Sequence, residues 1–404
     1  GTDAYMSRTP GSAGNQKTST QSMWIKIAKL STDQTVGINT SNGLGVWLNG
    51  DDTLTWYCHY DSGWEGKLKT TQVFRDPGAW YHIVTMVDTT QAVAANRAKV
   101  YVNGSQVTAF STEDYPDQND DTAFNAAAAH SIGIWLSTPS YYYNGYVAEM
   151  HWIDGSNLTP SSFGETNDEG VWVPKKYSGS YGTTGFYLDF ADSSDLGDDE
   201  SGQGNDWAET NIAASDQSTD TPTDNHCTLN SADNLYSGVA LSEGNKSFTN
   251  TAGAQHKAKG TMYPSSGKWY WEVKWLSGSS NGQVGLAQND VKSQWDMGDN
   301  RGDLTGESLG YRSYDGKTYK DSTLATFGDT WTTGDIISVA WDADNGKIYF
   351  GKNDTWQNSG DPTSGATGTG SAYALSSAQS GGGGWGPAVC NEGSSIYECY
   401  FAEA

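Results

Sequence analysis

The segment 334–356, GDIISVAWDADNGKIYFGKNDTW, has the pattern of a β-hairpin. Ile337, Val339 and Trp341 alternate with small or polar residues, and this period of two is typical of a strand that buries one face. The tripeptide DNG at 344–346 follows, and Asn-Gly supplies the positive φ of a tight turn. After it, Ile348 alternates again with polar neighbours. We therefore predict two antiparallel strands joined by a short turn.

The same order of residues occurs a second time, far away in the sequence. Residues 80–90 read WYHIVTMVDTT, and 96–107 read NRAKVYVNGSQV. Further strand-like segments lie on both sides of a stretch, 191–224, in which Asp, Ser and Thr replace apolar residues. We predict an all-β chain of two tandem β-sandwich domains, at 1–210 and 226–404, joined by an acidic Ser/Thr/Asp linker at 211–225.

The chain is strongly acidic. Its 404 residues carry 23 basic and 48 acidic side chains, which gives a formal net charge of −25. Because like charges repel, this balance disfavours binding to nucleic-acid backbones and to anionic membrane surfaces. No apolar run approaches the roughly 20 residues of a membrane helix. We expect neither nucleic-acid binding nor membrane insertion.

Three segments of the second half resemble the landmarks of the SPRY family, at 267–287 (GKWYWEVKWLSGSSNGQVGLA), 334–353 and 385–403. SPRY domains are two-sheet β-sandwiches that bind protein or peptide ligands through loops at one end, so the resemblance implies this fold and this mode of binding. Residues 18–190 resemble a laminin-G or concanavalin A-like domain. The segments that show this resemblance are WYHIVTMVD (80–88), KVYVNGSQV (99–107) and GYVAEMHWIDG (145–155). This second resemblance implies a concanavalin-like jelly-roll sandwich.

The order of these two modules resembles surface proteins of tailed bacteriophages. The resemblance implies a fibre, tail or decoration protein at the virion surface, outside the cell, in contact with the host and with other virion proteins. Virion appendages are symmetric, so it also implies a homo-oligomer, with a trimer favoured.

Enzymatic chemistry is the first alternative. Concanavalin-like folds include glycoside hydrolases whose active strand carries Glu-x-Asp-x-x-Glu, because retaining hydrolysis needs two carboxylates about 5 Å apart. We find no strand that carries this triplet. Glu149 in AEMHWID (148–154) is followed by His151 and Asp154, which we interpret as the wrong spacing, and Glu272 in WYWEVKW (269–275) stands alone. Nucleophile-elbow, P-loop and HExxH motifs are absent as well. We expect no enzymatic activity.

Aspartates cluster in the acidic stretch after residue 190. Ca²⁺ binds several oxygen ligands from a flexible loop, and Asp192, Asp195, Asp198 and Asp199 offer such oxygens. A solvated acidic loop without metal is the alternative. No motif requires a cofactor, and Ca²⁺ is the ion that these aspartates could bind.

Two cysteines near the C-terminus allow two interpretations. Cys390 and Cys399 flank a short turn and could face each other across two strands as a disulfide. Buried free thiols are the alternative. The four cysteines of the chain show no zinc-type spacing.

Aromatic side chains in loops are the candidates for ligand contact, because sugars stack on exposed rings and protein ligands anchor on them. The three consecutive tyrosines at 141–143 cannot all face a core, so at least one of them is expected to be exposed. By contrast, Trp24, Trp269, Trp271 and Trp341 lie in alternating strands and are expected in the core. The alternative for each candidate ring is packing under its own loop or at a subunit interface. The predicted ligand-binding residues are Trp64, Tyr141, Tyr142, Tyr143, Trp295, Tyr311, Tyr314 and Trp356.

The sequence thus predicts a non-catalytic virion surface protein, a phage fibre or adhesin that binds a host-surface glycan or protein through its sandwich loops. Weak contacts would be multiplied by the many copies on one particle. Two other functions stay open. One is a structural decoration protein of the capsid or tail without a host ligand, and the other is a secreted carbohydrate-binding protein.

Overall fold

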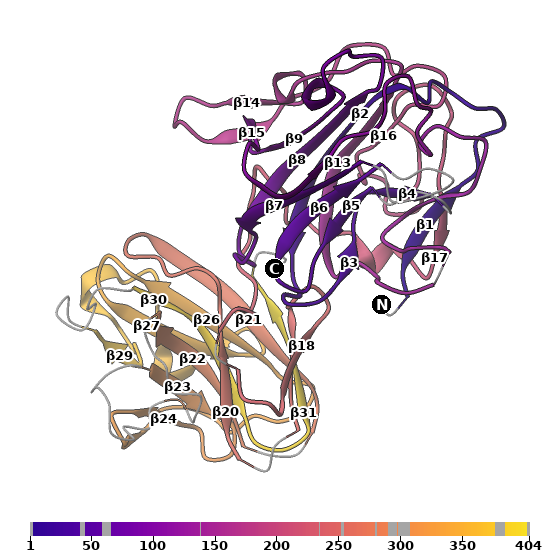
Figure 1. Cartoon of the computed structure of the whole chain (residues 1–404). Helices are drawn as coiled ribbons and strands as arrows, with labels where there is room; N and C mark the ends of the chain where they lie inside the picture. Colours follow the sequence, from indigo (N-terminus) through magenta and orange to yellow (C-terminus); the bar gives the residue numbers. More distant parts are fainter. Residues whose placement is uncertain are drawn as a thin grey trace. The chain divides into compact units, whose positions relative to one another are not determined.

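The computed structural model describes residues 3–40, 45–58, 66–137, 139–233, 235–251, 254–278, 281–289, 297, 308–375 and 384–401. These residues form β-strands and single-turn 3₁₀ helices (Figure 1). They include no helix of the length and hydropathy that a membrane span requires. The chain divides into two compact units, Gly1–Asn225 and His226–Ala404, each with its own hydrophobic core. The prediction of an all-β chain built from sandwiches is confirmed.

The first unit is a sandwich of two antiparallel sheets. The six-stranded sheet has the order β10 (Ser105–Gln106), β9 (Ala98–Val102), β8 (Trp80–Asp88), β2 (Thr18–Ile27), β13 (Gly145–Asp154) and β16 (Phe186–Leu188). The five-stranded sheet has the order β11 (Phe110–Asp114), β7 (Lys67–Val73), β6 (Thr53–Tyr57), β5 (Val46–Leu48) and β3 (Gln34–Thr35).

Two smaller sheets complete the first unit. One has the order β17 (Ala208–Thr210), β1 (Tyr5–Arg8), β12 (His130–Ile132) and β4 (Ile38–Thr40). The other pairs β14 (Gly164–Thr166) with β15 (Trp172–Pro174). Tyr5 lies opposite Thr210 in the antiparallel β1–β17 pair, so the first and last strands of the unit are neighbours.

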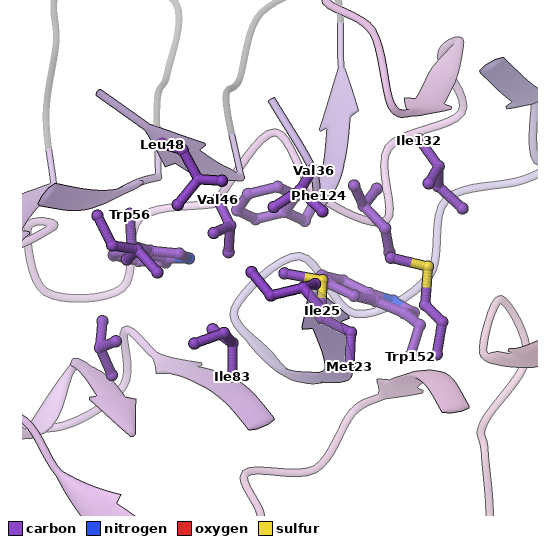
Figure 2. Packing of buried hydrophobic residues seen from close by; sticks show 14 of the residues in the cluster. Met23, Ile25, Val36, Val46, Leu48, Trp56, Ile83, Phe124, Ile132 and Trp152 are labelled. Atoms are coloured by element: carbon purple, nitrogen blue, oxygen red, sulfur yellow. The ribbon is translucent and has the colours of Figure 1, made fainter. Parts of the chain in front are cut away.

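The core of the first unit lies between its two large sheets (Figure 2). Met23 and Ile25 of β2 lie two residues apart and so share one face of the strand. They pack with Ile83 of β8 and with Trp56 of β6, all buried. Each such side chain contributes about 1.5–3 kcal/mol when it leaves water.

The second unit is also a two-sheet sandwich. Its larger sheet has the order β18 (Val239–Ser242), β19 (Ser247–Asn250), β31 (Ser395–Tyr400), β21 (Lys268–Ser277), β26 (Ile336–Asp342), β27 (Lys347–Lys352) and β28 (Thr355–Trp356), with β29 (Tyr373–Ala374) also on β27. The other sheet has the order β20 (His256–Lys259), β30 (Trp385–Asn391), β22 (Gly282–Gln288), β23 (Ser308–Arg312), β24 (Lys317–Lys320) and β25 (Thr323–Thr326). The 3₁₀ helices of the two units are η1 (Ala94–Asn96), η2 (Pro160–Ser162), η3 (Ala214–Asp216), η4 (Gln357–Ser359) and η5 (Gly365–Thr367).

The hairpin predicted at 334–356 is β26–β27, with Asp342 opposite Lys347. Gly346 ends its turn at φ 63°, in the left-handed region that favours glycine. A Cβ at this position would lie 2.2 Å from the carbonyl oxygen of Leu375, so the turn also needs glycine for space. The second predicted hairpin, around residues 80–107, is β8–β9.

Three of the four tryptophans expected in the core are buried: Trp24, Trp271 and Trp341. The prediction for Trp269 was wrong, because this side chain is 44% exposed. Trp269 is the second residue of β21, so the strand alternation extends beyond the packed part of the sandwich. Its indole N–H donates to the carbonyl of Ser266 at 2.7 Å.

The segment predicted as an acidic linker, 211–225, belongs to the first unit. Asp220 within it is buried and accepts from the ammonium group of Lys26 at 2.6 Å and from the indole N–H of Trp80 at 2.9 Å. Asn225 also accepts from Lys26, at 2.9 Å. A side chain of the supposed linker is therefore anchored on the six-stranded sheet, because Lys26 and Trp80 belong to β2 and β8.

Cys390 and Cys399 are both buried thiols, and they form no disulfide with each other. They lie in β30 and β31, which belong to different sheets of the second unit. Burial raises the pKa of the Cys399 thiol well above its usual range, which keeps it protonated.

Candidate ligand-binding sites

The three tyrosines at 141–143 differ in burial. Tyr141 is 38% exposed, and Tyr142 is partly exposed. Tyr143 packs against the core of the first unit, and its hydroxyl donates to the carbonyl of Lys26 at 2.9 Å. The expectation that at least one of these rings is exposed is therefore met by Tyr141.

Tyr141 lies in a group of aromatic rings with Trp47 and Trp135, which we name the Tyr141 cluster. The ring centroid of Tyr141 lies 4.7 Å from that of Trp47 and 6.0 Å from that of Trp135. The carboxylate of Asp33 lies at its edge and accepts from the indole N–H of Trp47 at 3.3 Å. Rings with an exposed face and a carboxylate beside them can stack on a sugar and accept its hydroxyl hydrogens.

The backbone of Tyr141 has φ 60°, in the left-handed region. For a residue with a side chain this conformation costs about 1–2 kcal/mol. The carbonyl of Tyr141 accepts from the backbone N–H of Thr35 at 3.0 Å, which ties the strained residue to β3. Strain of this kind concentrates at ligand-binding positions, so the observed φ supports Tyr141 as a site residue.

Sequence reasoning missed Trp47, Trp135 and Asp33. Trp47 lies in β5 opposite Thr35 of β3, and the carbonyl of Tyr141 accepts a hydrogen bond from the backbone N–H of the same Thr35. The contact thus depends on strand register, which the pattern of residues does not reveal. The aromatic character of each segment was the available signal.

In the second unit the structure separates the predicted residues. Tyr314 is exposed, and the guanidinium of Arg312 lies 4.4 Å from its ring centroid. The prediction for Tyr311 was wrong, because Tyr311 is fully buried in the core rather than in a loop. It shares a face of β23 with Leu309, which is also buried, and this alternation turns its ring inward.

The remaining predicted rings are Trp356, Trp64 and Trp295. Trp356 is partly exposed in β28, and its ring centroid lies 6.4 Å from that of Tyr270. Trp64 and Trp295 lie outside the described residues. The structure therefore brings Trp356 to a neighbour that the sequence did not suggest.

Ser22 and His82 lie on the face of the six-stranded sheet opposite to the face that carries Met23 and Ile83. Ser22 Oγ lies 2.8 Å from His82 Nε2, and the indole N–H of Trp172 donates to His82 Nδ1 at 2.9 Å. An indole N–H can only donate, so Nδ1 is an acceptor and Nε2 carries the proton of the neutral ring. Burial lowers the pKa of His82 to about 3. His82 therefore donates to Ser22 and is not placed as a base for it.

The judgement that Glu149, His151 and Asp154 have the wrong spacing was incorrect: their spacing is that of the hydrolase triplet, with His in the second position and Asp in the third. The Asp154 carboxylate accepts from the backbone N–H of Asn15 at 2.7 Å and also from Asn125, Thr183 and Thr184. Burial lowers the pKa of His151 to about 3. Asp154 thus connects three loops through these hydrogen bonds. We therefore interpret Glu149, His151 and Asp154 as structural residues rather than catalytic ones.

Two family models match the chain. Residues 1–161 match the concanavalin A-like lectin/glucanases superfamily (Laminin_G_3), and residues 268–384 match the SPRY domain. The chain contains a concanavalin A-like domain in its first unit and a SPRY domain in its second unit. The two matches fall within the first and the second compact unit, respectively, and both predicted domain resemblances are confirmed.

Among solved structures, the SPRY domain of human HERC1 is 18% identical, with a TM-score of 0.32. This likeness covers 41% of this chain and 94% of that one. A second human SPRY domain is 17% identical with a TM-score of 0.28, and the likeness covers 41% and 98% of the two chains. No curated protein matches the chain. The domain assignment rests on the family models.

The aspartates proposed for Ca²⁺, all in the concanavalin A-like domain, are Asp192, Asp195, Asp198 and Asp199. Within the described residues, no three His, Cys, Asp or Glu side chains gather as metal ligands. The Asp199 carboxylate instead accepts from the backbone N–H groups of Tyr187, Ser201 and Asn205 at 2.8–2.9 Å, and from the Ser201 hydroxyl. Asp192 accepts similarly within its own turn. Each of these two carboxylates therefore organises its own loop.

Replacing Asp199 with Ala should destabilise the concanavalin A-like domain by about 2 kcal/mol or more, because four donors lose a largely buried acceptor. Asp195→Ala is the matched control at an exposed carboxylate, with an expected change within about 0.5 kcal/mol. Urea unfolding with hydrogen exchange read on β16 measures both. Equal effects in the two variants would contradict the structural role of Asp199.

Proposed function

We propose that the chain is a non-catalytic binding protein and that the Tyr141 cluster binds a carbohydrate. The observation that carries the proposal is the exposed Tyr141 ring held beside Trp47, Trp135 and the Asp33 carboxylate. The first family model, whose name includes lectins, supports the same chemistry.

In this site the sugar stacks its apolar face on the Tyr141 ring, and the neighbouring Trp135 ring provides a second apolar surface. The Asp33 carboxylate is exposed, so it can accept a hydroxyl hydrogen without a large desolvation cost. One exposed ring and one carboxylate give weak binding to a single sugar. High affinity therefore requires several copies that act together.

The absence of catalysis is part of the proposal. It is supported by a neutral His82 that donates to Ser22 and by an Asp154 carboxylate that already accepts four hydrogen bonds. The fibre or adhesin role at a virion surface, the host ligand and the trimer stay predictions. They rest on the resemblance of the module order to tailed-phage surface proteins.

Binding of the full chain to an array of bacterial surface polysaccharides and simple glycans tests the site. Tyr141→Ala should reduce binding of the best glycan about fivefold or more, because stacking on an aromatic ring contributes about 1 kcal/mol. Tyr314→Ala removes an exposed tyrosine of the SPRY domain and is the matched control, with unchanged binding expected.

Equal loss in the two variants would place the glycan elsewhere. Hydrolysis of the bound glycan, followed by mass spectrometry of the products, would contradict the non-catalytic proposal. If no glycan binds, the carbohydrate assignment is wrong and the decoration role becomes the better hypothesis.

A further inference from the structure

The larger sheet of the SPRY domain carries a row of side chains on the face that turns away from its core. Across β31, β21, β26, β27 and β28, the register aligns Tyr400, Glu272, Ser338, Gly351 and Trp356. Side chains opposite each other in antiparallel strands point to the same face. We name this set, together with Tyr270, the Glu272 row.

Two aromatic rings meet on the row. Tyr270 lies two residues before Glu272 on β21, so it shares the same face, and it is 42% exposed. The Trp356 ring lies nearly perpendicular to it, at 75°. Gly351, which lies between Ser338 and Trp356 in the register, places no side chain on this face. The result is an apolar corner built on strands.

The carboxylate of Glu272 lies beside this corner. Its Oε1 accepts from the hydroxyls of Tyr270 and Ser338, which fixes the carboxylate close to the rings. Glu272 forms no ion pair with any described residue. Lys268, at the start of the same strand, is paired with Asp342 at 3.8 Å. Lys274, two residues after Glu272 on the same face, lies opposite Glu398 of β31. The corner therefore holds a carboxylate that forms no ion pair with a described residue.

Charge complementarity selects the occupant. A cation within about 6 Å of an aromatic centroid is attracted by the ring, and a guanidinium also forms two parallel hydrogen bonds with a carboxylate. An anionic ligand would be repelled by Glu272 at the corner. Glu398, farther along the same face, accepts from Tyr400 and lies opposite Lys274. An aromatic corner is also typical of the centre of a protein interface.

We propose that the Glu272 row binds a basic segment of a protein partner, with an arginine side chain over Tyr270 and Trp356 and paired with Glu272. This site is separate from the Tyr141 cluster, and it lies on a sheet face rather than on the loops of the SPRY sandwich. Its existence does not depend on carbohydrate binding by the first domain.

The probe is an array of random ten-residue peptides incubated with the full chain at low salt. We expect the bound peptides to be enriched in arginine. The best peptide is then compared with the same peptide in which citrulline, the uncharged analogue, replaces each arginine. Loss of the charge should weaken binding about tenfold or more.

Two variants locate the site. Glu272→Gln should weaken the arginine peptide about tenfold, whereas Glu209→Gln changes net charge equally in the first domain and should stay within about twofold. Tyr270→Ala should also weaken binding, and circular dichroism with thermal unfolding checks that the domain stays folded.

Other outcomes overturn the proposal. Equal loss in the two glutamine variants would mean general electrostatic attraction to an acidic protein. Enrichment of peptides without arginine or lysine, equal binding of the citrulline peptide, or no bound peptide would each exclude a basic partner. Loss of an array glycan in Glu272→Gln, without loss of a peptide, would reassign the row to sugars.

Discussion

Replacement of Asp220 by alanine is expected to destabilise the concanavalin A-like domain by about 3–5 kcal/mol. The side chains of Lys26 and Asp220 are 1% and 3% exposed, and their charged atoms lie 2.6 Å apart. Removal of the carboxylate takes away the negative charge beside the buried ammonium group, which still donates to the side-chain oxygen of Asn225 at 2.9 Å. The indole N–H of Trp80 loses its acceptor as well.

A double replacement distinguishes the loss of the pair from the burial of a lone charge. Lys26→Met combined with Asp220→Leu removes both charges and should recover most of the stability, because desolvation opposes the attraction in a buried pair. Hydrogen exchange of β2 and β8 in the full chain, followed by mass spectrometry, gives the free energy of opening. A small effect of Asp220→Ala would mean that the 211–225 segment is held by other contacts.

Acidification from pH 6.5 to about pH 4.5 is the second large effect that we expect. Burial lowers the pKa of His82 and His151 to about 3 and that of His130 to about 4. The unfolded chain takes up protons near pH 6.5, whereas the folded chain does not. The stability that these histidines provide is thus present above pH 6.5 and falls as the pH decreases, by about 2 kcal/mol for each histidine.

Denaturant unfolding across this pH range measures the slope. His151→Phe keeps a ring on Tyr187, which stacks at 4.3 Å, and should flatten the slope even if its absolute stability is lower. Glu149 acts in the opposite direction, because burial raises its pKa, so Glu149→Gln should steepen the slope. Most carboxylates titrate below this range. A pH-independent stability in the parent chain would mean that the histidines are protonated in the folded state.

The fold could be predicted because its information is local. Alternation in 334–356 predicted β26 and β27, and the glycine of their turn is required at φ 63°. Alternation does not reveal where the core ends, which is why Trp269 was misplaced. The prediction that Tyr311 is exposed in a loop was wrong because Tyr311 belongs to β23, a strand that is buried.

The candidate sites were predicted only in part, because they depend on contacts between distant segments. The tyrosine triplet identified Tyr141, but the neighbouring Trp47 follows from the pairing of β3 with β5. The composition of the acidic loop suggested a cation. It did not reveal that backbone N–H groups surround Asp199. The contact of Tyr270 with Trp356 depends on the register of β21, β26 and β27, which the sequence pattern does not reveal.

The pairing of β1 with β17 determines how the first domain resists a pulling force. Because Tyr5 lies opposite Thr210, the two free ends leave the pair at the same end, and tension between them would open the hydrogen bonds one after another. Asn225 and Asp220 lie along the chain between Thr210 and the SPRY domain, so tension from that side reaches Asn225, which also accepts from Lys26, and then the Lys26–Asp220 contact before it reaches β17. This contact transfers the load to β2, an interior strand of the six-stranded sheet, and shields the weak β1–β17 zipper from it.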